Sequence, residues 1–406
     1  MTPVENVSAS IRPRWKPSRG KAATRRITTT SWRPGPHRDV TGLKYGVATL
    51  TPVILQTGDG VPQGATYLPS TPDHVLWGRL PCAADRPVIS VDPGAELVID
   101  TISHEGILED QGRDPKAYFG AHGVDGVLDD AIALAASEHP RTWGVDGPHV
   151  TTGPIEVRGA EVGDLLAIRV LETTPRVPYG VISNRHGRGA LPGEYPLDGD
   201  VFSVFAEVTE RDGRAVGTLP LRPGSDEVVA FDLKPFLGIM GVAVAGDVRP
   251  HSVPPGPHGG NIDINLLTVG STLYLPVQVA GALAYVGDPH FAQGDGEVAL
   301  TAMEASLRVR LGFDVIARED AVASFGELVG PMVETSDFLV PTGMDEDLDV
   351  AMQNCVRAAI ALLQARFGMD PRHAYAYLSA ATDFDISQVV DLVKGVHARI
   401  RTSDFA

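Results

Sequence analysis

The densest group of polar side chains follows directly after a long apolar run, in the segment Gly287–Glu297 (GDPHFAQGDGE). Asp288 and His290 are two residues apart, so on an extended backbone both side chains point to the same face of a strand. A carboxylate and an imidazole placed in this way are a common pair of ligands for a divalent metal ion. The polar residues that continue at steps of two are Gln293, Asp295 and Glu297. From spacing alone, a catalytic loop and an ordinary polar surface turn explain this segment equally well.

A second polar group precedes the apolar run, in the segment His258–Asp263 (HGGNID). Asn261 and Asp263 are two residues apart after a pair of glycines. Their side-chain oxygens could join Asp288 and His290 around one ion, as a mixed nitrogen and oxygen site that suits zinc or a harder divalent metal. The competing interpretation is a turn rich in Asn and Asp, which is the more frequent use of such residues.

Histidines elsewhere give weaker indications. His149 lies in GPHVTTGP (147–154), just ahead of an expected strand, where it could reach the site or could simply cap a turn. Three histidines are expected at the surface: His37, His373 and His397. The histidines without a pattern that assigns them are His74, His104, His122, His139, His186 and His251.

Several other hydrolytic chemistries lack their required residues. The sequence has no G-x-S-x-G nucleophile elbow, no H-E-x-x-H and no P-loop. It has two cysteines, Cys82 and Cys355, neither in a setting that predicts an activated thiolate. A hydrolase of this sequence would therefore use a metal-activated water as its nucleophile.

The elements that must position these residues are mainly strands. Two-residue alternation broken by glycine turns predicts strands within 87–103 and 155–172, and the apolar run 266–286 is expected to form a pair of buried strands because two glycines and a proline interrupt it. Helices are expected at 128–137, 348–362, 371–378 and 386–394. The fold class predicted is α+β and mainly β, with β-sandwich or barrel modules up to about residue 320 and a helical segment at about 345–400.

Composition and charge limit the partners. Residues 1–40 carry nine Lys and Arg against two acids, a balance of +7, which leaves −24 for the rest because the whole chain carries −17. So acidic a body repels phosphate backbones, and nucleic acid is not an expected partner. The predicted organisation is a basic, disordered extension over 1–42 and one domain over 43–406. No membrane association is expected, and two cysteines without an export signal predict a cytoplasmic protein.

Several segments together resemble the acetamidase/formamidase family. They are LPSTPDHVLWG (68–78), GPHVTTGPIEVRGAEVGDLLAIRV (147–170), PFLGIMGVA (235–243), GGNIDINLLTVGSTLYLPVQVAGALAYVGDPHFAQGDGE (259–297) and AYAYLSAATDFDISQVVDLVKGVHARI (374–400). The resemblance covers residues 45–400 in the order of the family. It implies hydrolysis of short linear amides to a carboxylate and ammonia, and a homo-oligomer. It also implies a divalent metal, for which zinc is the first choice and calcium or another divalent ion is the alternative.

The resemblance also implies roles for individual residues. The metal ligands would be Asn261, Asp263, Asp288 and His290, and the catalytic groups would be Glu297 as proton shuttle, Gln293 as an oxyanion donor, and Asp295. The substrate contacts would be His149, the Gly259 and Gly260 amides, and Phe291, which replaces a small residue and puts the substrate in question. Two alternatives remain at this point: a hydrolase of a lactam, imide or guanidine-type substrate on the same site, and a non-catalytic protein that binds a small ligand or metal.

Overall fold

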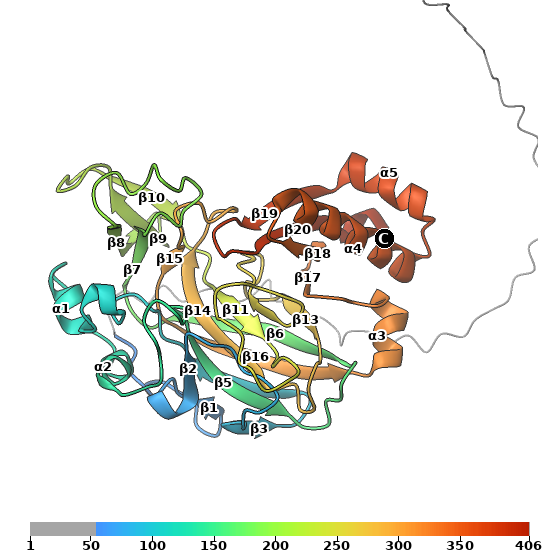
Figure 1. Cartoon of the computed structure of the whole chain (residues 1–406), viewed down its shortest axis with the longest axis horizontal. Helices are drawn as coiled ribbons and strands as arrows, with labels where there is room; N and C mark the ends of the chain where they lie inside the picture. Colours follow the sequence, from blue (N-terminus) through green and yellow to red (C-terminus); the bar gives the residue numbers. More distant parts are fainter. Residues whose placement is uncertain (1–53, 406) are drawn as a thin grey trace, which may run out of the picture. The chain divides into compact units, whose positions relative to one another are not determined.

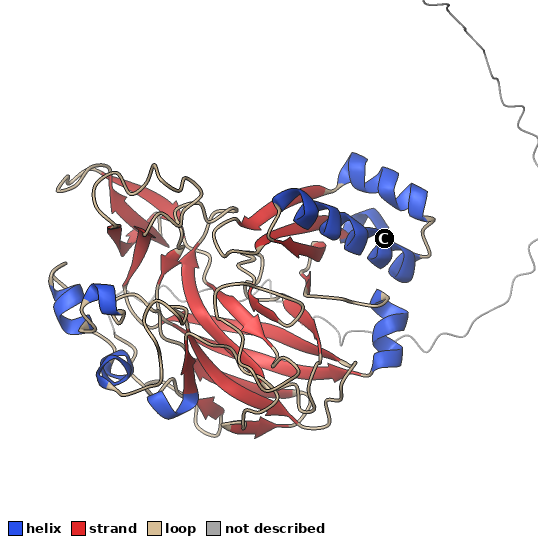
Figure 2. Ribbon diagram, in the orientation of Figure 1, coloured by secondary structure: helices blue, strands red, loops and turns tan. Residues whose placement is uncertain are grey.

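The computed structural model describes residues 54–405, and within them strands predominate (Figure 2). The predicted extension over 1–42 lies outside the described residues, and the boundary of the predicted domain at residue 43 stays a prediction. The strands form two large sheets, and no closed barrel is present among the described strands, so the sandwich alternative of the predicted fold class is the one observed. Of the helices in the described part, none has the length and apolarity to span a membrane.

The first sheet has nine strands in the order β1-β4-β16-β6-β13-β17-β18-β20-β19. In that order they are β1 (Thr66–Leu68), β4 (Ala95–Asp100), β16 (Leu307–Ile316), β6 (Leu165–Pro175), β13 (Thr272–Pro276), β17 (Met332–Glu334), β18 (Phe338–Asp345), β20 (Lys394–Arg401) and β19 (Asp383–Gln388). Alternation along β6 shows how the sheet packs. Leu166 and Ile168 lie in the main core, whereas Leu165 and Ala167 lie in a second core on the other face.

The second sheet has eleven strands and carries most of the polar residues singled out above. Along its main path they are β10 (Val228–Asp232), β9 (Arg214–Pro220), β8 (Val201–Arg211), β7 (Tyr179–Arg185), β15 (Met303–Glu304), β14 (Ala284–Ala292), β11 (Phe236–Gly241) and β12 (Gly259–Asn261). Beside this path, β5 (Val150–Val157) pairs with β14, β2 (Val75–Trp77) and β3 (Ile89–Val91). The main core holds residues from both sheets, and therefore lies between them.

The apolar run 266–286 forms two strands, as predicted. Its first part contributes β13 to the first sheet and its end begins β14 in the second. The run therefore crosses from one sheet to the other and delivers Asp288 and His290 at the end of a fully buried strand.

Five α-helices flank the sheets. They are α1 (Pro115–Gly120), α2 (Asp129–Ala136), α3 (Arg318–Phe325), α4 (Leu348–Phe367) and α5 (Pro371–Ala381), with 3₁₀ turns η1 (Pro72–His74), η2 (Glu109–Gln111) and η3 (Thr402–Phe405). Figure 1 shows α3, α4 and α5 grouped beside β17, β18 and β20. The Asp347 carboxylate caps the start of α4, and Gly368 ends the helix in the left-handed conformation. The helices α2, α4 and α5 confirm three of the four predicted helical segments.

The fourth helical prediction, over 386–394, is wrong. The segment comprises the end of β19, a series of bends and the start of β20. β19 and β20 pair in antiparallel register, with Ile386 opposite Val396. Because β-branched residues pack well on a pleated surface and lose side-chain freedom in a helix, this pairing outweighs the apolar periodicity that suggested a helix. The C-terminal segment is therefore helical only as far as Ala381.

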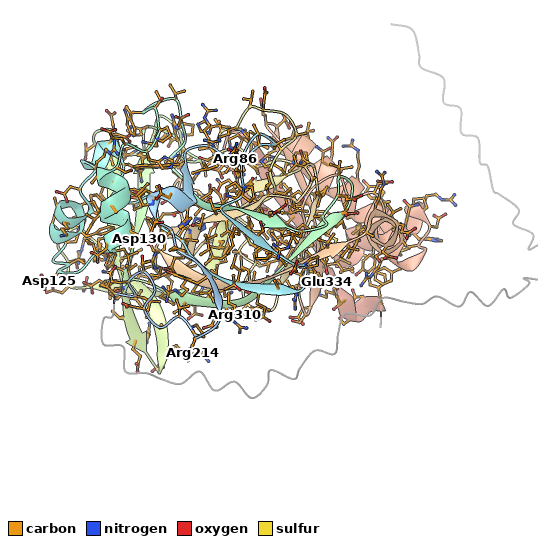
Figure 3. All side chains as sticks on the ribbon, turned by 90° about the horizontal axis from the view of Figure 1, so that it is seen from below. Arg86, Asp125, Asp130, Arg214, Arg310 and Glu334 are labelled. Carbon is orange, nitrogen blue, oxygen red and sulfur yellow. The ribbon has the colours of Figure 1, made fainter. Side chains whose placement is uncertain are left out.

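A buried charged network ties the N-terminal part of the first sheet to α2. The Arg176 side chain is fully buried, and its Nη1 lies 2.9 Å from Asp130 Oδ2 and 3.2 Å from Ser70 Oγ. Its Nη2 lies 3.6 Å from Asp100 Oδ2. Asp130 is labelled in Figure 3, which also labels Arg310, a residue of an exposed ion pair on β16.

Replacing Arg176 by methionine is expected to lower the free energy of unfolding by about 3–5 kcal/mol, because it leaves the buried Asp130 carboxylate without its counter-ion. Arg310→Met is the matched control: Arg310 Nη1 lies 2.7 Å from Glu96 Oε2, with both side chains at least 40% exposed. Its expected loss is at most about 1 kcal/mol. Urea unfolding of both variants measures the difference, and equal losses would contradict the assigned role of Arg176.

Candidate metal centre

The neighbouring strands β14 and β15 bring three polar side chains together, those of Asp288, His290 and Glu304. His290 on β14 is the register partner of Glu304 on β15, and Asp288 lies two residues earlier on β14. His290 Nε2 lies 3.1 Å from Glu304 Oε1 and 3.2 Å from Asp288 Oδ2. All three residues are at most 4% exposed. The predicted proximity of Asp288 and His290 is therefore observed, and Glu304 joins them.

Asp263 reaches the same place from the segment after β12. The backbone N–H groups of Ile262 and Asp263 both donate to the Gly238 carbonyl on β11. Asp263 Oδ1 then lies 4.0 Å from His290 Nδ1. The Asp263 carbonyl accepts a hydrogen bond from Gln293 Nε2 at 2.9 Å. Segments on either side of the apolar run thus converge on His290.

Three acidic residues of this region have left-handed backbone conformations. The φ angles are 46° at Asp263, 51° at Asp288 and 47° at Glu297. Residues other than glycine rarely adopt positive φ, and such strain gathers at functional sites because the surrounding structure holds it in place. The direction of these carboxylate side chains therefore depends on the local φ angles as well as on the alternation of side chains along a strand.

Gly238 lies on the strand facing Asp288, because its neighbours Leu237 and Ile239 pair with Pro289 and Gly287. A Cβ atom there would lie 2.6 Å from His290 Cε1 and 2.8 Å from Asp288 Oδ2, and would also overlap Asp263 Oδ1. The missing side chain is what leaves room for these groups to converge.

Gly238→Ala is therefore expected to displace the three groups and to reduce both metal content and activity, the latter by about 10²-fold, the typical cost of a misplacement near 1 Å. Gly120→Ala is the matched control, since a Cβ at Gly120 meets no heavy atom within 4 Å. Metal analysis and a turnover assay on both variants measure the effect. Normal metal content in Gly238→Ala would show that the ligands do not meet at this point.

Many polar atoms of this cluster are buried without a hydrogen-bond partner. They include both carboxylate oxygens of Asp263, Oδ1 of Asp288, both ring nitrogens of His290 and Oε2 of Glu304. Buried polar atoms are nearly always paired, so each of these needs a partner. Ligand atoms of Asp263, His290 and Glu297, and likewise of Asp288, His290 and Glu304, lie within 4.8 Å of one another. The donor set is therefore one that a divalent cation would satisfy.

The ionisation of the cluster reflects crowded carboxylates. Burial, with a smaller contribution from Asp288, raises the pKa of Asp263 to about 7 against the opposing charge of His290. Burial and then the charge of Asp263 raise the pKa of Glu297 well above its ordinary value. Burial alone would raise the pKa of Asp288, but His149 and His290 outweigh it and hold that pKa well below the usual range. Carboxylates of such different basicity can act as ligand and as proton carrier in one site.

Comparisons with known proteins agree with this geometry. Residues 242–400, which contain most of the cluster, match the sequence model of the acetamidase/formamidase family. The chain is 31% identical over 204 residues to an acetamidase of Mycolicibacterium smegmatis, covering 37% of this chain and 49% of that protein. It is 27% identical over 306 residues to a formamidase of Methylophilus methylotrophus, covering 60% and 74%.

A solved structure extends the likeness over most of the fold. The crystal structure of a predicted acetamidase/formamidase from Thermoanaerobacter tengcongensis superposes with a TM-score of 0.64 at 26% identity, covering 84% of this chain and 97% of that one. The chain is therefore similar to proteins of the acetamidase/formamidase family. The aligned region spans only about half, 49%, of the length of the Mycolicibacterium relative.

The other predicted site residues take different positions. His149 is buried with its Nε2 3.9 Å from Asp288 Oδ2, so it adjoins the cluster. Asn261 is buried on β12 and its Oδ1 has no partner among the described residues. The Gly259 amide donates to the Gly256 carbonyl, and Gly260 follows it on β12. The roles of Asn261, Gly259 and Gly260 therefore stay predictions.

Three further predicted residues face other surroundings. Both amide hydrogens of Gln293 have carbonyl acceptors, on Asp263 and Ser387, so this residue positions Asp263 and links it to the C-terminal segment. Asp295 is exposed, accepts from Asn265 Nδ2 at 3.0 Å and lies with Asp385 and His397, apart from the main cluster. Phe291 is fully buried in the main core, on the opposite face of β14 from His290.

Three buried residues near the cluster have no individual signal in the sequence: Glu304, His104 and Asp391. Glu304 is found only through the strand register that places it opposite His290. His104 follows β4, and its Nδ1 lies 3.5 Å from Asp288 Oδ1. Asp391 comes from the bend between β19 and β20, where a helix was predicted, and burial followed by the charges of Asp263 and Glu297 raises its pKa well above the ordinary value. His397, predicted at the surface, is in fact buried.

Proposed function

We propose that this chain hydrolyses short linear carboxamides, such as formamide or acetamide, to a carboxylate and ammonia with the help of a divalent metal ion. The observation that carries the proposal is the buried cluster of Asp263, Asp288, His290 and Glu304, whose free oxygens and nitrogens fit a cation. The similarity to an acetamidase and a formamidase supports the substrate class.

Zinc is the proposed ion. The donors of the cluster are imidazole nitrogen and carboxylate oxygen, a mixture that zinc accepts, whereas calcium prefers oxygen ligands alone. Asp263, Asp288 and His290 would hold it, with Glu304 beside His290. An ion in that position would polarise the amide carbonyl and lower the pKa of a water molecule.

The remaining chemistry belongs to the side chains. Glu297 is buried, has a raised pKa and lies with Asp263 and His290, so it can take a proton from water and pass it to the leaving nitrogen. Gln293 keeps Asp263 in place through its backbone carbonyl. Because every carboxylate of the cluster is less than one tenth exposed, bulk water is largely excluded, which strengthens the electrostatic interactions at the site.

The test is ammonia release from a panel of formamide, acetamide, longer linear amides, a lactam, an imide and a guanidine compound. Full-length protein is assayed as purified, after removal of metal by a chelator, and after zinc is added back. Release from short linear amides that is lost with the chelator and restored by zinc is the expected result. Activity confined to the cyclic or guanidine compounds, or undiminished after complete metal removal, would contradict the proposal.

We also propose that the protein is cytoplasmic and forms a homo-oligomer. Cys82 and Cys355 are both free thiols in buried positions, which supports the cytoplasm. A homo-oligomer follows from the family resemblance. Light scattering on the eluting protein measures the mass, and a monomer at micromolar concentration would contradict the oligomer.

A further inference from the structure

Two further histidines, His104 and His149, lie beside Asp288. His104 Nδ1 lies 3.5 Å from Asp288 Oδ1, and His149 Nε2 lies 3.9 Å from Asp288 Oδ2. They come from segments far apart in the chain, after β4 and before β5, yet their rings meet edge to face with centroids 5.4 Å apart. Ligand atoms of His104, His149 and Asp288 lie within 4.8 Å of one another, and all three residues are at most 6% exposed.

The second nitrogen of each imidazole faces a group that can orient the ring. His149 Nδ1 forms a hydrogen bond with Ser252 Oγ at 3.1 Å. His104 Nε2 lies 3.5 Å from Glu105 Oε1, and Glu105 is itself paired with Arg185. Histidines that bind metals almost always have this arrangement, in which a hydroxyl, carboxylate or carbonyl partner fixes one nitrogen and leaves the other free for the ion. Both free nitrogens point to the same carboxylate.

A direct hydrogen bond between these groups does not account for the arrangement. His104 Nδ1 and Asp288 Oδ1 are both buried and have no hydrogen-bond partner among the described residues. At 3.9 Å, His149 Nε2 is also too far from Asp288 Oδ2 for a hydrogen bond. A cation bound between these two imidazole nitrogens and the shared carboxylate would give all three groups a partner.

We propose that the centre holds two divalent ions that share Asp288, the second of them bound by His104 and His149. The inference rests on the proposed function for the first ion, held by Asp263, Asp288 and His290. The geometry that points to it is the position of Asp288 among three histidines: Oδ1 lies 3.5 Å from His104 Nδ1, whereas Oδ2 lies 3.2 Å from His290 Nε2 and 3.9 Å from His149 Nε2. Paired ions about 3.5–4 Å apart recur in hydrolytic enzymes, where they act on the attacking and leaving oxygens together.

The experiment counts ions per chain. Full-length protein is stripped of metal with a chelator and titrated with Co²⁺, whose absorption spectrum reports each binding event, and zinc-loaded protein is analysed for metal content. The variants are His104→Gln, His149→Gln, Asp263→Asn and the double variant His149→Gln/Asp263→Asn. His139→Gln is the matched control, because His139 is a partly buried histidine that bonds the Val75 carbonyl at 2.9 Å outside the centre.

The expected result is two equivalents for the wild type and His139→Gln, one for each single variant of the centre, and none for the double variant. One equivalent in the wild type would overturn the proposal, as would two equivalents retained in both His104→Gln and His149→Gln. If a variant does not fold, the wild-type titration alone decides. A wild type with one ion and chelator-sensitive amide hydrolysis would overturn this inference and leave the proposed function intact, whereas a wild type that binds no ion would overturn the metal in both.

Discussion

Asp288→Ala is expected to abolish metal binding and to lower ammonia release by more than about 10³-fold, because a lost Lewis acid withdraws several kcal/mol of transition-state stabilisation. Asp288 is the one carboxylate that contacts three histidines, His104, His149 and His290. Its loss would leave these imidazoles without the oxygen ligand that links them. Glu304, by comparison, lies near two of these histidines, His104 and His290.

The measurement is metal content and ammonia release on the same preparation. Asp92→Ala serves as the control, because Asp92 is a highly exposed partner of Arg158 at the surface. Circular dichroism and a thermal melt establish that Asp288→Ala is folded, which is expected since removing a carboxylate also relieves crowding among Asp263, Glu297 and Glu304. A folded Asp288→Ala protein with full metal content would place the ion elsewhere.

The sequence predicted the local pairs of this site better than its long-range contacts. The two-residue spacing of Asp288 and His290 correctly placed both side chains in one cluster, although the left-handed φ of Asp288 shows that regular strand geometry is only part of the reason. The structure adds Gly238, whose importance depends on the strand opposite Asp288. Sequence spacing identifies neighbours along one strand, whereas the register between strands determines which residues of other strands join the site.

Glu304 and His104 show why the remainder could not be predicted. Glu304 joins the cluster because β15, only two residues long, pairs with the end of β14. His104 joins it because the first sheet places the residues after β4 beside the second sheet. A lone glutamate or histidine without periodic neighbours has the same sequence appearance in a surface loop, so burial and pairing across more than a hundred residues are needed to identify it.

The error over 386–394 had the same origin and a functional consequence. The apolar residues of this segment suggested a helix, whereas pairing of β19 with β20 determines the observed conformation. In a helix, the direction of the Asp391 side chain would follow from the helical repeat of about 3.6 residues. The observed bend instead buries Asp391 against Asp263 and Glu297, and the Ser387 carbonyl accepts hydrogen bonds from Gln293 and Gly296. The C-terminal segment therefore supports the loop that contains Gln293 and Gly296 directly.

Glu297→Gln separates the proton carrier from the ligands. The substitution keeps the shape of the side chain but removes its capacity to accept a proton, so turnover is expected to fall by about 10²–10⁴-fold, the usual contribution of a general acid or base. Metal content is expected to stay near normal, because Asp263, Asp288, His290 and Glu304 remain. Glu172→Gln, at an exposed position near Arg310, is the control for the loss of one carboxylate.

The metal content of the Glu297 variant discriminates between two roles that the geometry allows. Glu297 lies with Asp263 and His290 closely enough to be a ligand itself. If it were, the glutamine variant would lose metal and activity together, as Asp288→Ala is expected to do. If it is the proton carrier, kcat falls while metal content and KM for a short amide change little, because a contact made mainly in the transition state has been removed. Full activity in both Glu297→Gln and Asp288→Ala would place the catalytic centre outside this cluster.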